Sequence, residues 1–252
     1  MVDINKVTEY IHRNGYVSTQ DICVKFGLSE STSRRLLDKL AVMGRITRVH
    51  GGAMPASING MATEYQLRYA LNRSEKIAIA KKAAEYVQDF STIMLMGGTT
   101  VSEMCPFIEH MNITVVTSSL LVLNGLKHSR NVRILLLGGL YNPQEEDVGG
   151  LLANKGLENL HADHLFASTS GFDEMYGFSS TNVAVDLHMR CLEASVTASV
   201  LADSSKYMKG GAVITARMEQ IQNLFTDSDL SERARHAIEA RGVNVIIADV
   251  NA

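Results

Sequence analysis

Five short runs of glycine, hydroxyl and charged residues carry the side chains that could bind a small anion. Each run directly follows a stretch of apolar, strand-forming residues. Glycine lets backbone N–H groups approach a ligand, and serine or threonine hydroxyls add further donors. Because the carboxyl ends of parallel strands meet at one edge of a sheet, we expect the runs to lie together. They are residues 97–100, 117–119, 138–139, 168–171 and 203–206.

Lys206 is the only cation within these runs, and it favours a phosphate over a neutral ligand because charge-assisted hydrogen bonds are the stronger ones. The run at 97–100 also leads into a predicted helix, whose first N–H groups favour an anion. The sequence therefore predicts a site for a phosphorylated small molecule. The residues expected to bind it are Gly98, Thr99, Thr100, Thr117, Ser118, Gly138, Gly139, Gly171 and Lys206.

A second group of polar residues, near the start of the chain, has the composition of a DNA-binding surface. A predicted helix after Ser29 begins with polar residues, and a basic segment between glycines follows at 44–52. Arginine can form two hydrogen bonds with guanine, and serine or threonine can bond several bases. In a helix-turn-helix the start of the second helix of the pair meets the base edges. The residues predicted to contact DNA are Thr32, Ser33, Arg34, Arg35, Arg45 and Arg48.

Three predicted helices and a strand position these residues. Apolar residues at helical spacing predict a helix over 4–14. The second helix begins at Ser18, with Asp21 as its capping-box partner, and the third begins after Ser29. Strand-forming residues at 46–49 follow directly. This order predicts a winged helix-turn-helix.

The charge distribution agrees with a head that meets a polyanion. The first 60 residues hold eight Lys or Arg and five Asp or Glu, which gives them a net charge of +3. The whole chain carries −3, so the remainder carries −6. A basic head on an acidic body is typical of a protein whose head binds nucleic acid.

Apolar runs that alternate with helical patterns predict an α/β body with a mostly parallel sheet. The expected strands are residues 92–96, 113–117, 132–137, 164–169, 197–202, 221–226 and 243–248. A helix capped by Ser74 precedes them, and a last helix runs from the cap Ser231 to Arg241. We predict a DNA-binding domain at 1–53, a proline-containing linker at 54–73 and an effector-binding domain at 74–252.

Several other functions find no support in the sequence. His161 and His164 have a spacing that a metal could use, but no third ligand is near, so no metal site is expected. The three cysteines lie far apart and predict neither a zinc site nor disulfides. Nucleotide-binding glycine patterns and a nucleophile elbow are absent, so we expect no cofactor and no catalytic residue. Without a long apolar run or a leader, a cytoplasmic protein with no membrane partner is expected.

Segments of both predicted domains resemble the DeoR family of bacterial regulators of sugar metabolism. In the head, Gly27-Leu-Ser-Glu-Ser-Thr-Ser-Arg-Arg-Leu-Leu37 and Gly44-Arg-Ile-Thr-Arg-Val-His-Gly-Gly-Ala53 are similar to the family signature. In the body, the similar motifs are Gly98-Thr-Thr100, Leu137-Gly-Gly139 and Asp203-Ser-Ser-Lys206. The head departs from the family pattern at Ser33 and Leu36, where the family has an apolar residue and Asp.

The resemblance implies a Rossmann-like sensor domain related to sugar-phosphate isomerases and deaminases. We predict a transcriptional regulator, a repressor of a sugar-utilisation operon, that binds double-stranded operator DNA and a phosphorylated sugar. Because helix-turn-helix proteins commonly pair two heads on half-sites, a homo-oligomer, dimer or tetramer, is expected. We expect no enzyme activity. The alternative is an isomerase- or deaminase-like enzyme that carries a DNA-binding head.

Overall fold

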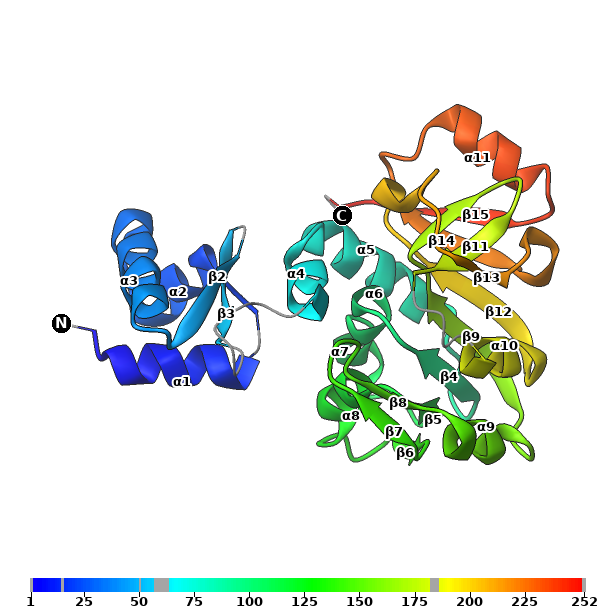
Figure 1. Ribbon diagram of the computed structural model, residues 1–252, viewed down its shortest axis with the longest axis horizontal. Coiled ribbons are helices and arrows are strands. Elements are labelled where there is room, and N and C mark those ends of the chain that lie inside the picture. The colour runs from blue at the N-terminus through cyan, green and yellow to red at the C-terminus, as the bar shows by residue number, and fades with distance from the viewer. Residues whose placement is uncertain (1, 15, 50, 57–63, 182–185, 251–252) are drawn as a thin grey trace. The chain divides into compact units, whose positions relative to one another are not determined.

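The computed structural model describes residues 2–14, 16–49, 51–56, 64–181 and 186–250. The chain divides into two units, Met1–Arg73 and Ser74–Ala252. Figure 1 labels the elements of each unit.

Three helices and a small sheet make up most of the first unit. The elements are α1 (Ile4–Asn14), β1 (Val17–Ser18), α2 (Thr19–Phe26), α3 (Glu30–Val42), β2 (Ile46–Val49) and β3 (Gly52–Pro55). β3 lies between β1 and β2 and is antiparallel to both. The helices and the sheet share one core, which includes Val7, Ile11, Ile22, Leu37, Leu40 and Ile46. The order of elements confirms the predicted helix-turn-helix head.

Capping residues fix the turn between α2 and α3. Ser18 and Asp21 form the expected capping box at the start of α2, because each side chain accepts a hydrogen bond from the other's backbone N–H. Gly27 ends α2 with φ 63°, a left-handed conformation that glycine adopts without strain. Ser29 then caps α3 by accepting a hydrogen bond from the backbone N–H of Thr32.

The stretch expected to be a linker contains folded structure. Residues 57–63 lie outside the described part of the chain, but α4 spans Glu64–Ala70. The ring centroid of Tyr69 lies 6.3 Å from that of Tyr16. The guanidinium of Arg73 lies 5.2 Å from the Tyr16 centroid. The aromatic contact therefore attaches α4 to the head, and the cation–π contact attaches Arg73, the last residue of the first unit.

The strands expected for the body form one parallel sheet of seven strands. They are β4 (Thr92–Met96), β5 (Thr114–Thr117), β6 (Arg133–Leu136), β9 (Ala162–Ser168), β12 (Ser195–Leu201), β14 (Asn223–Asp227) and β15 (Asn244–Ala248). Their order is β15-β14-β12-β9-β4-β5-β6, and each neighbouring pair is parallel. The predicted α/β body is therefore confirmed.

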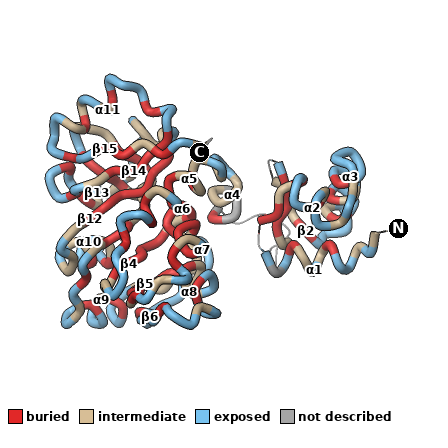
Figure 2. Tube along the Cα trace, turned by 180° about the vertical axis from the view of Figure 1, so that it is seen from behind, coloured by how far each residue is buried: buried red, intermediate tan, exposed pale blue. Residues whose placement is uncertain are grey.

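Helices cover both faces of this sheet, because successive residues of a strand point to opposite sides. In β4, Ile93 and Leu95 enter the core beneath α5, α6, α7 and α8, whereas Met94 and Met96 enter the core beneath α9, α10 and α11. Figure 2 shows the buried strands of the sheet. The helices are α5 (Arg73–Ala84), α6 (Thr99–Ser102), α7 (Cys105–Ile108), α8 (Leu120–Leu126), α9 (Leu151–Leu157), α10 (Asp186–Glu193) and α11 (Glu232–Glu239).

Of the two helix caps expected in the body, one is confirmed and one is wrong. Ser231 accepts a hydrogen bond from the backbone N–H of Ala234 and caps α11. Ser74 does not cap α5, because α5 already begins at Arg73 and the Ser74 hydroxyl bonds the Glu75 carboxylate.

Two small antiparallel sheets accompany the large one. The first has the order β10-β11-β13 and the second is the β7–β8 hairpin. Their strands are β7 (Leu140–Asn142), β8 (Asp147–Gly149), β10 (Gly171–Asp173), β11 (Gly177–Ser180) and β13 (Val213–Ala216). The hairpin is joined to the loop after β5, since Val148 N–H donates to Ser118 O at 3.0 Å and Leu120 N–H to Glu146 O at 2.9 Å. Short 3-10 turns at Ser204–Lys206 and Met218–Gln220 complete the unit.

Candidate functional site

The five polar runs lie at the same edge of the large sheet, because they follow the carboxyl ends of β4, β5, β6, β9 and β12. The chain builds the sheet from β4 outward through β5 to β6 and then returns to add β9 on the other side of β4. The connections therefore change direction between β4 and β9 (Figure 1). In open α/β sheets a crevice at such a point is the usual place for a ligand.

A turn at Gly97 and Gly98 lies at this point of the sheet edge, where β4 ends beside β9. Both glycines have positive φ, 62° and 75°, so the turn requires residues without a Cβ. A Cβ on Gly98 would overlap the side chain of Ser168, which ends β9. The Ser168 hydroxyl in turn donates a hydrogen bond of 3.3 Å to the Gly97 carbonyl. The end of β9 thus holds the turn after β4 in place.

His188 of α10 packs against the same turn and was not among the predicted site residues. Its Nε2 lies 3.3 Å from the point where a Cβ on Gly97 would be. Its Nδ1 is buried and has no hydrogen-bond partner within the described part of the chain. Burial lowers the pKa of His188, although Glu145 acts in the opposite direction, so the ring is neutral at neutral pH. A buried, unpartnered ring nitrogen beside a glycine turn can accept or donate one hydrogen bond to a ligand.

Thr99 and Thr100 follow the turn and are almost fully buried, at 7% and 5% exposure. They form the first turn of α6, which ends at Ser102. A helix of four residues has only a weak dipole, so the expected contribution of a helix N-terminus to anion binding is small here. Anion binding at this turn would depend on individual N–H and hydroxyl donors.

Three other predicted site residues have structural roles that explain their identity. The Thr117 hydroxyl donates to Leu95 O at 2.6 Å and accepts from Ser119 N–H, so it joins β5 to β4. A Cβ on Gly171 would overlap the backbone of Lys209, and one on Gly139 would overlap Gly149. These glycines are therefore required for close packing of the backbone.

Gly138 and Ser118 remain at the edge of the sheet. Gly138 is exposed, and the space around its Cα is open. Ser118 is 1% exposed, and its carbonyl accepts the hydrogen bond that attaches the β7–β8 hairpin.

Lys206 lies in the turn that follows β12 and is partly buried. β12 is the neighbour of β9 in the sheet. Two acids fix this turn: Ser204 N–H donates to the Asp227 carboxylate at 2.7 Å, and Ser205 donates to Asp203. Asp227 was not predicted, although an acid at the end of an apolar strand is a signal that the sequence offers. The geometry places one positively charged residue two strands away from the glycine turn.

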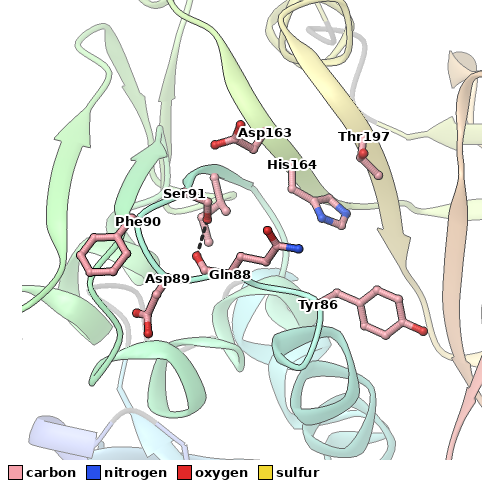
Figure 3. Close-up of a pocket in the computed structure, with 9 residues that line it drawn as sticks. Tyr86, Gln88, Asp89, Phe90, Ser91, Asp163, His164 and Thr197 are labelled. Carbon is pink, nitrogen blue, oxygen red and sulfur yellow. Dashed lines mark hydrogen bonds between the residues drawn. The ribbon is translucent and has the colours of Figure 1, made fainter.

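A cavity of about 400 Å³ lies at the opposite edge of the sheet (Figure 3). It is lined by the α5–β4 loop and by the amino ends of β9 and β12. Its charged lining residues, among those described, are Asp89 and Asp163, which would repel a phosphate. Both carboxylates already accept backbone hydrogen bonds, from Asn112 and Thr92 respectively. The cavity is therefore not a suitable phosphate site.

His164 at this cavity belongs to a chain of hydrogen bonds across four strands. Its Nε2 lies 2.7 Å from the Ser199 hydroxyl, which also accepts from Asn223 at 3.0 Å. Asn244 donates to Asn223 on the next strand. Burial lowers the pKa of His164 to about 4, so the ring is neutral at neutral pH. The chain of bonds satisfies buried polar groups and explains His164 without a metal.

In the first unit, α3 presents most of its predicted DNA contacts to solvent. Thr32, Arg34 and Arg35 are exposed, and Arg34 forms a 2.5 Å ion pair with Glu30 one turn earlier. Ser33 is different: it is fully buried and accepts a 3.2 Å hydrogen bond from the Cys23 thiol. The expectation that Ser33 contacts DNA is therefore wrong, because its side chain is part of the core of the head.

The two arginines of the wing are held by neighbours. Arg48 bonds the Asp38 carboxylate at 2.9 Å and the Gly52 carbonyl at 2.6 Å. Arg45 bonds the Asn5 side chain at 2.6 Å. Arg45 is exposed, whereas Arg48 is partly buried and links α3 to the wing. Arg45 is thus the more accessible of the two for a phosphate.

The described residues contain no group of three or more His, Cys, Asp or Glu placed to hold a metal ion. None of the helices in the described ranges is long and apolar enough to cross a bilayer.

Comparison with solved structures concerns the fold alone. Ribose 5 phosphate isomerase A from Neisseria gonorrhoeae superposes with a TM-score of 0.39 at 16% identity, over 53% of this chain and 52% of that one. The β subunit of eIF2B from Chaetomium thermophilum superposes with a TM-score of 0.48 at 11% identity, over 68% and 53%.

Comparison with known sequences is more specific. Residues 4–58 match the DeoR-like helix-turn-helix domain, and residues 71–228 match the DeoR C terminal sensor domain. The HTH-type transcriptional regulator YulB of Bacillus subtilis is 30% identical over 95% of this chain and 93% of its own. The L-fucose operon activator of Haemophilus influenzae is 28% identical over 96% and 97%, and the lactose phosphotransferase system repressor of Staphylococcus epidermidis 29% over 91% and 93%. The chain therefore belongs to the DeoR family of helix-turn-helix transcriptional regulators.

Proposed function

We propose that this regulator binds a phosphorylated sugar in the crevice between the carboxyl ends of β4 and β9 and controls a sugar-utilisation operon in response. The observation that carries the proposal is the glycine turn at this crevice, with the buried Nδ1 of His188 beside it. The names of two relatives, an L-fucose operon activator and a lactose phosphotransferase system repressor, support a sugar as the signal.

The two ends of such a ligand would meet different groups. A phosphate accepts hydrogen bonds, so backbone N–H groups near Gly98 and the hydroxyls of Thr99 and Thr100 suit it, with Lys206 as the cation. A neutral His188 suits a sugar hydroxyl, which can both donate and accept. We therefore assign the phosphate to the glycine turn and a sugar hydroxyl to His188.

The head would read the operator with the exposed start of α3. Arg34 and Arg35 are the proposed base or phosphate contacts, and Thr32 is a further contact. Arg45 of the wing is the proposed phosphate contact, and Arg48 supports the wing through Asp38. Two heads on paired half-sites require a homo-oligomer, which we propose operates in the compartment that holds the DNA.

The proposed direction of control is repression. A ligand that favours one arrangement of the heads lowers operator affinity, and operator DNA then lowers ligand affinity by the same factor. The coupling in such proteins is about 1–3 kcal/mol.

The rival function, sugar-phosphate isomerisation or deamination, needs a base placed against a substrate carbon. At this edge, Asp203 and Asp227 already accept hydrogen bonds from Ser205 and Ser204. We therefore propose ligand sensing without turnover. Incubation with each ligand that binds, followed by analysis of the products, checks this assignment, and a converted ligand would contradict it.

Titration calorimetry with free sugars and their phosphates tests the proposed ligand. One phosphorylated sugar should bind at least about tenfold more tightly than its free form, as expected for a charged hydrogen-bonding group. Lys206→Ala should remove most of this preference, whereas the control Lys209→Ala should keep it. A free sugar that binds as tightly as its phosphate would contradict the proposal.

Gel-shift titrations on DNA from upstream of the gene test the regulatory half of the proposal. The intact protein should release the fragment when the ligand is added. Lys206→Ala should bind the fragment equally well and stay bound in the presence of ligand. Tighter binding on ligand addition would overturn repression and favour activation.

A further inference from the structure

The second unit exposes a group of large apolar side chains at one end of its sheet. Leu140, Leu151 and Leu152 are 82%, 69% and 68% exposed. Leu135 and Leu136 of β6 are 37% and 41% exposed, and Tyr141 of β7 is 44% exposed. α9 packs beside the end of β6, since the Leu137 side chain lies 3.3 Å from the point where a Cβ on Gly156 would be. We call these six exposed residues the β6 surface. Large exposed apolar side chains that gather at one end of a soluble domain mark a candidate interaction site.

β6 is also the last strand of the sheet, and its outer edge has no neighbouring strand among the described residues. Arg133 and Leu137 direct their N–H groups to β5, bonding Ile113 O at 2.9 Å and Thr117 O at 2.8 Å. Because backbone groups alternate along a strand, those of Ile134 and Leu136 point outward. The edge therefore offers donors and acceptors that another strand can pair with.

Apart from Arg133 at its start, β6 lacks the charges that normally prevent strand pairing. Exposed edges usually carry charges, which discourage association. Residues 134–144 contain no charged side chain. The opposite edge strand of the same sheet differs, because Val245, Ile246 and Ala248 of β15 are buried at 4%, 9% and 2% exposure. Of the two ends of the sheet, the β6 end is thus the one that combines an open edge with exposed apolar side chains.

We propose that the β6 surface binds a second copy of this chain, with the two β6 strands antiparallel across a two-fold axis. If Leu135 lies on the axis, Ile134 of one copy opposes Leu136 of the other. The outward N–H group of each can then donate a hydrogen bond to the outward carbonyl of the other. Ile134, Leu135 and Leu136, which would face one another in this pairing, are uncharged, so the two strands meet without repulsion. The pairing extends the parallel sheet of each copy into one continuous sheet.

The docked surface is continuous with the candidate effector site. The β7–β8 hairpin carries Leu140 and Tyr141, and its other strand bonds the loop after β5 through Ser118. A ligand that shifts this loop would shift the hairpin and hence the contact between copies. This coupling rests on the proposed function, but the docking itself does not.

Analytical ultracentrifugation of the full-length protein, without DNA or sugar, tests the docking. The protein should sediment as a dimer or larger at micromolar concentration. The double variant Leu136→Lys/Leu140→Lys should raise the dissociation constant at least about 30-fold, the effect of losing a central interface contact. The control Met175→Lys changes a side chain that is 70% exposed elsewhere and should leave the assembly unchanged. A monomeric parent protein, or a double variant that assembles like its parent, would overturn the proposal.

A cysteine at the axis tests the pairing of the strands themselves. Directly opposed residues of a non-hydrogen-bonded antiparallel pair have Cα atoms about 4.5 Å apart, which a disulfide can span. Leu135→Cys should therefore give a covalent dimer on mild oxidation, whereas the parent protein and Met175→Cys should not. If the Leu135→Cys variant assembles but never cross-links, while the lysine variants dissociate, the antiparallel edge is excluded. Neither assay contains a ligand or an operator. A dimer that forms through another surface would therefore overturn the β6 pairing and leave the proposed function standing.

Discussion

Neighbouring residues of α3 have opposite environments, because each step along a helix turns the side chain by about 100°. Ser33 lies in the core of the head and bonds Cys23, whereas Thr32, Arg34 and Arg35 face solvent. The small hydroxyl of Ser33 occupies a place next to α2 that a larger polar side chain could not fill. Ser33 is thus unavailable to DNA, and the exposed residues on either side of it remain the proposed contacts.

Alanine substitutions at Arg35 and Ser33 should separate these roles. Arg35→Ala should weaken operator binding by about 1–3 kcal/mol, the usual loss for a base-reading arginine. Ser33→Ala should leave operator affinity unchanged and lower the free energy of unfolding by about 1 kcal/mol, because one buried hydrogen bond is lost. Fluorescence anisotropy and urea unfolding measure the two effects. Equal losses of DNA affinity in both variants would contradict the assignment.

His164 should make stability depend on pH. Its pKa is lowered from 6.5 in the unfolded chain to about 4 in the folded protein, so the unfolded state binds more protons between these values. The free energy of unfolding should therefore fall as pH falls from about 6.5 to about 4, by at most about 1.4 kcal/mol per pH unit.

Comparison with His164→Gln isolates this contribution, because glutamine keeps a hydrogen-bonding group near Ser199 but does not titrate. Urea unfolding at pH 7 and pH 5 should show a smaller loss for the variant than for its parent. An identical pH dependence in both proteins would show that His164 is charged in the folded state or solvated.

At the scale of elements, the turn after β4 is the part of the candidate site most sensitive to substitution. Gly98 and Gly150 are matched: both precede a helix with positive φ, 75° and 86°. A Cβ at Gly98 would overlap Ser168, whereas a Cβ at Gly150 would meet nothing within 4 Å. A side chain at either position would therefore cause backbone strain, but only a side chain at Gly98 would also clash with β9.

Gly98→Ala should thus destabilise the protein more than Gly150→Ala does. Backbone strain should lower the free energy of unfolding of each variant by about 1–3 kcal/mol. The decrease should be larger for Gly98→Ala, because the end of β9 must also move. Adding Ser168→Gly should restore part of the extra loss, which a double-mutant cycle in urea measures. Equal losses at the two glycines, with no rescue, would show that the turn is not held by β9.

The sequence predicts the elements that bury continuous apolar runs and misses those that do not. All the strands of the large sheet are predicted, because each contains a run of apolar residues typical of a parallel strand, including the exposed edge strand β6. The β7–β8 hairpin and the β10-β11-β13 sheet are missed. Their strands are short, and apolar residues within them are mixed with glycine and polar residues.

The candidate site shows the same limit. The sequence predicts that the loops of the site lie at one edge of the sheet, because the sheet topology brings them there. It does not predict the role of each side chain in these loops. Thr117 and Gly171 have the residue types of a ligand site, yet both are explained by internal packing. His188 belongs to the crevice only through tertiary contact with Gly97, and no spacing in the sequence reveals that contact.

For the whole molecule, the division into two units predicts that the second folds without the first. A fragment of residues 73–252 contains α5 and the entire sheet. It should unfold cooperatively and bind the phosphorylated sugar with the affinity of the full chain, but it should not bind the operator. Calorimetry and gel shifts check both halves. A fragment that lacks cooperative unfolding would show that the head contributes to the core of the second unit.

The place of β4 in the sheet also determines the order in which the second unit can form. β4, β5 and β6 can pair in turn soon after they are synthesised, whereas the contacts of β4 with β9 join residues 71 positions apart, as between Thr92 and Asp163. Pairing between strands so distant in sequence is slow. Until β9 pairs with it, the apolar edge of β4 is exposed in the nascent chain and is a site for aggregation. The proposed ligand site between β4 and β9 can form only after these two strands pair. A sugar phosphate that binds there, as proposed, would stabilise the finished protein but would not assist the early steps of its folding.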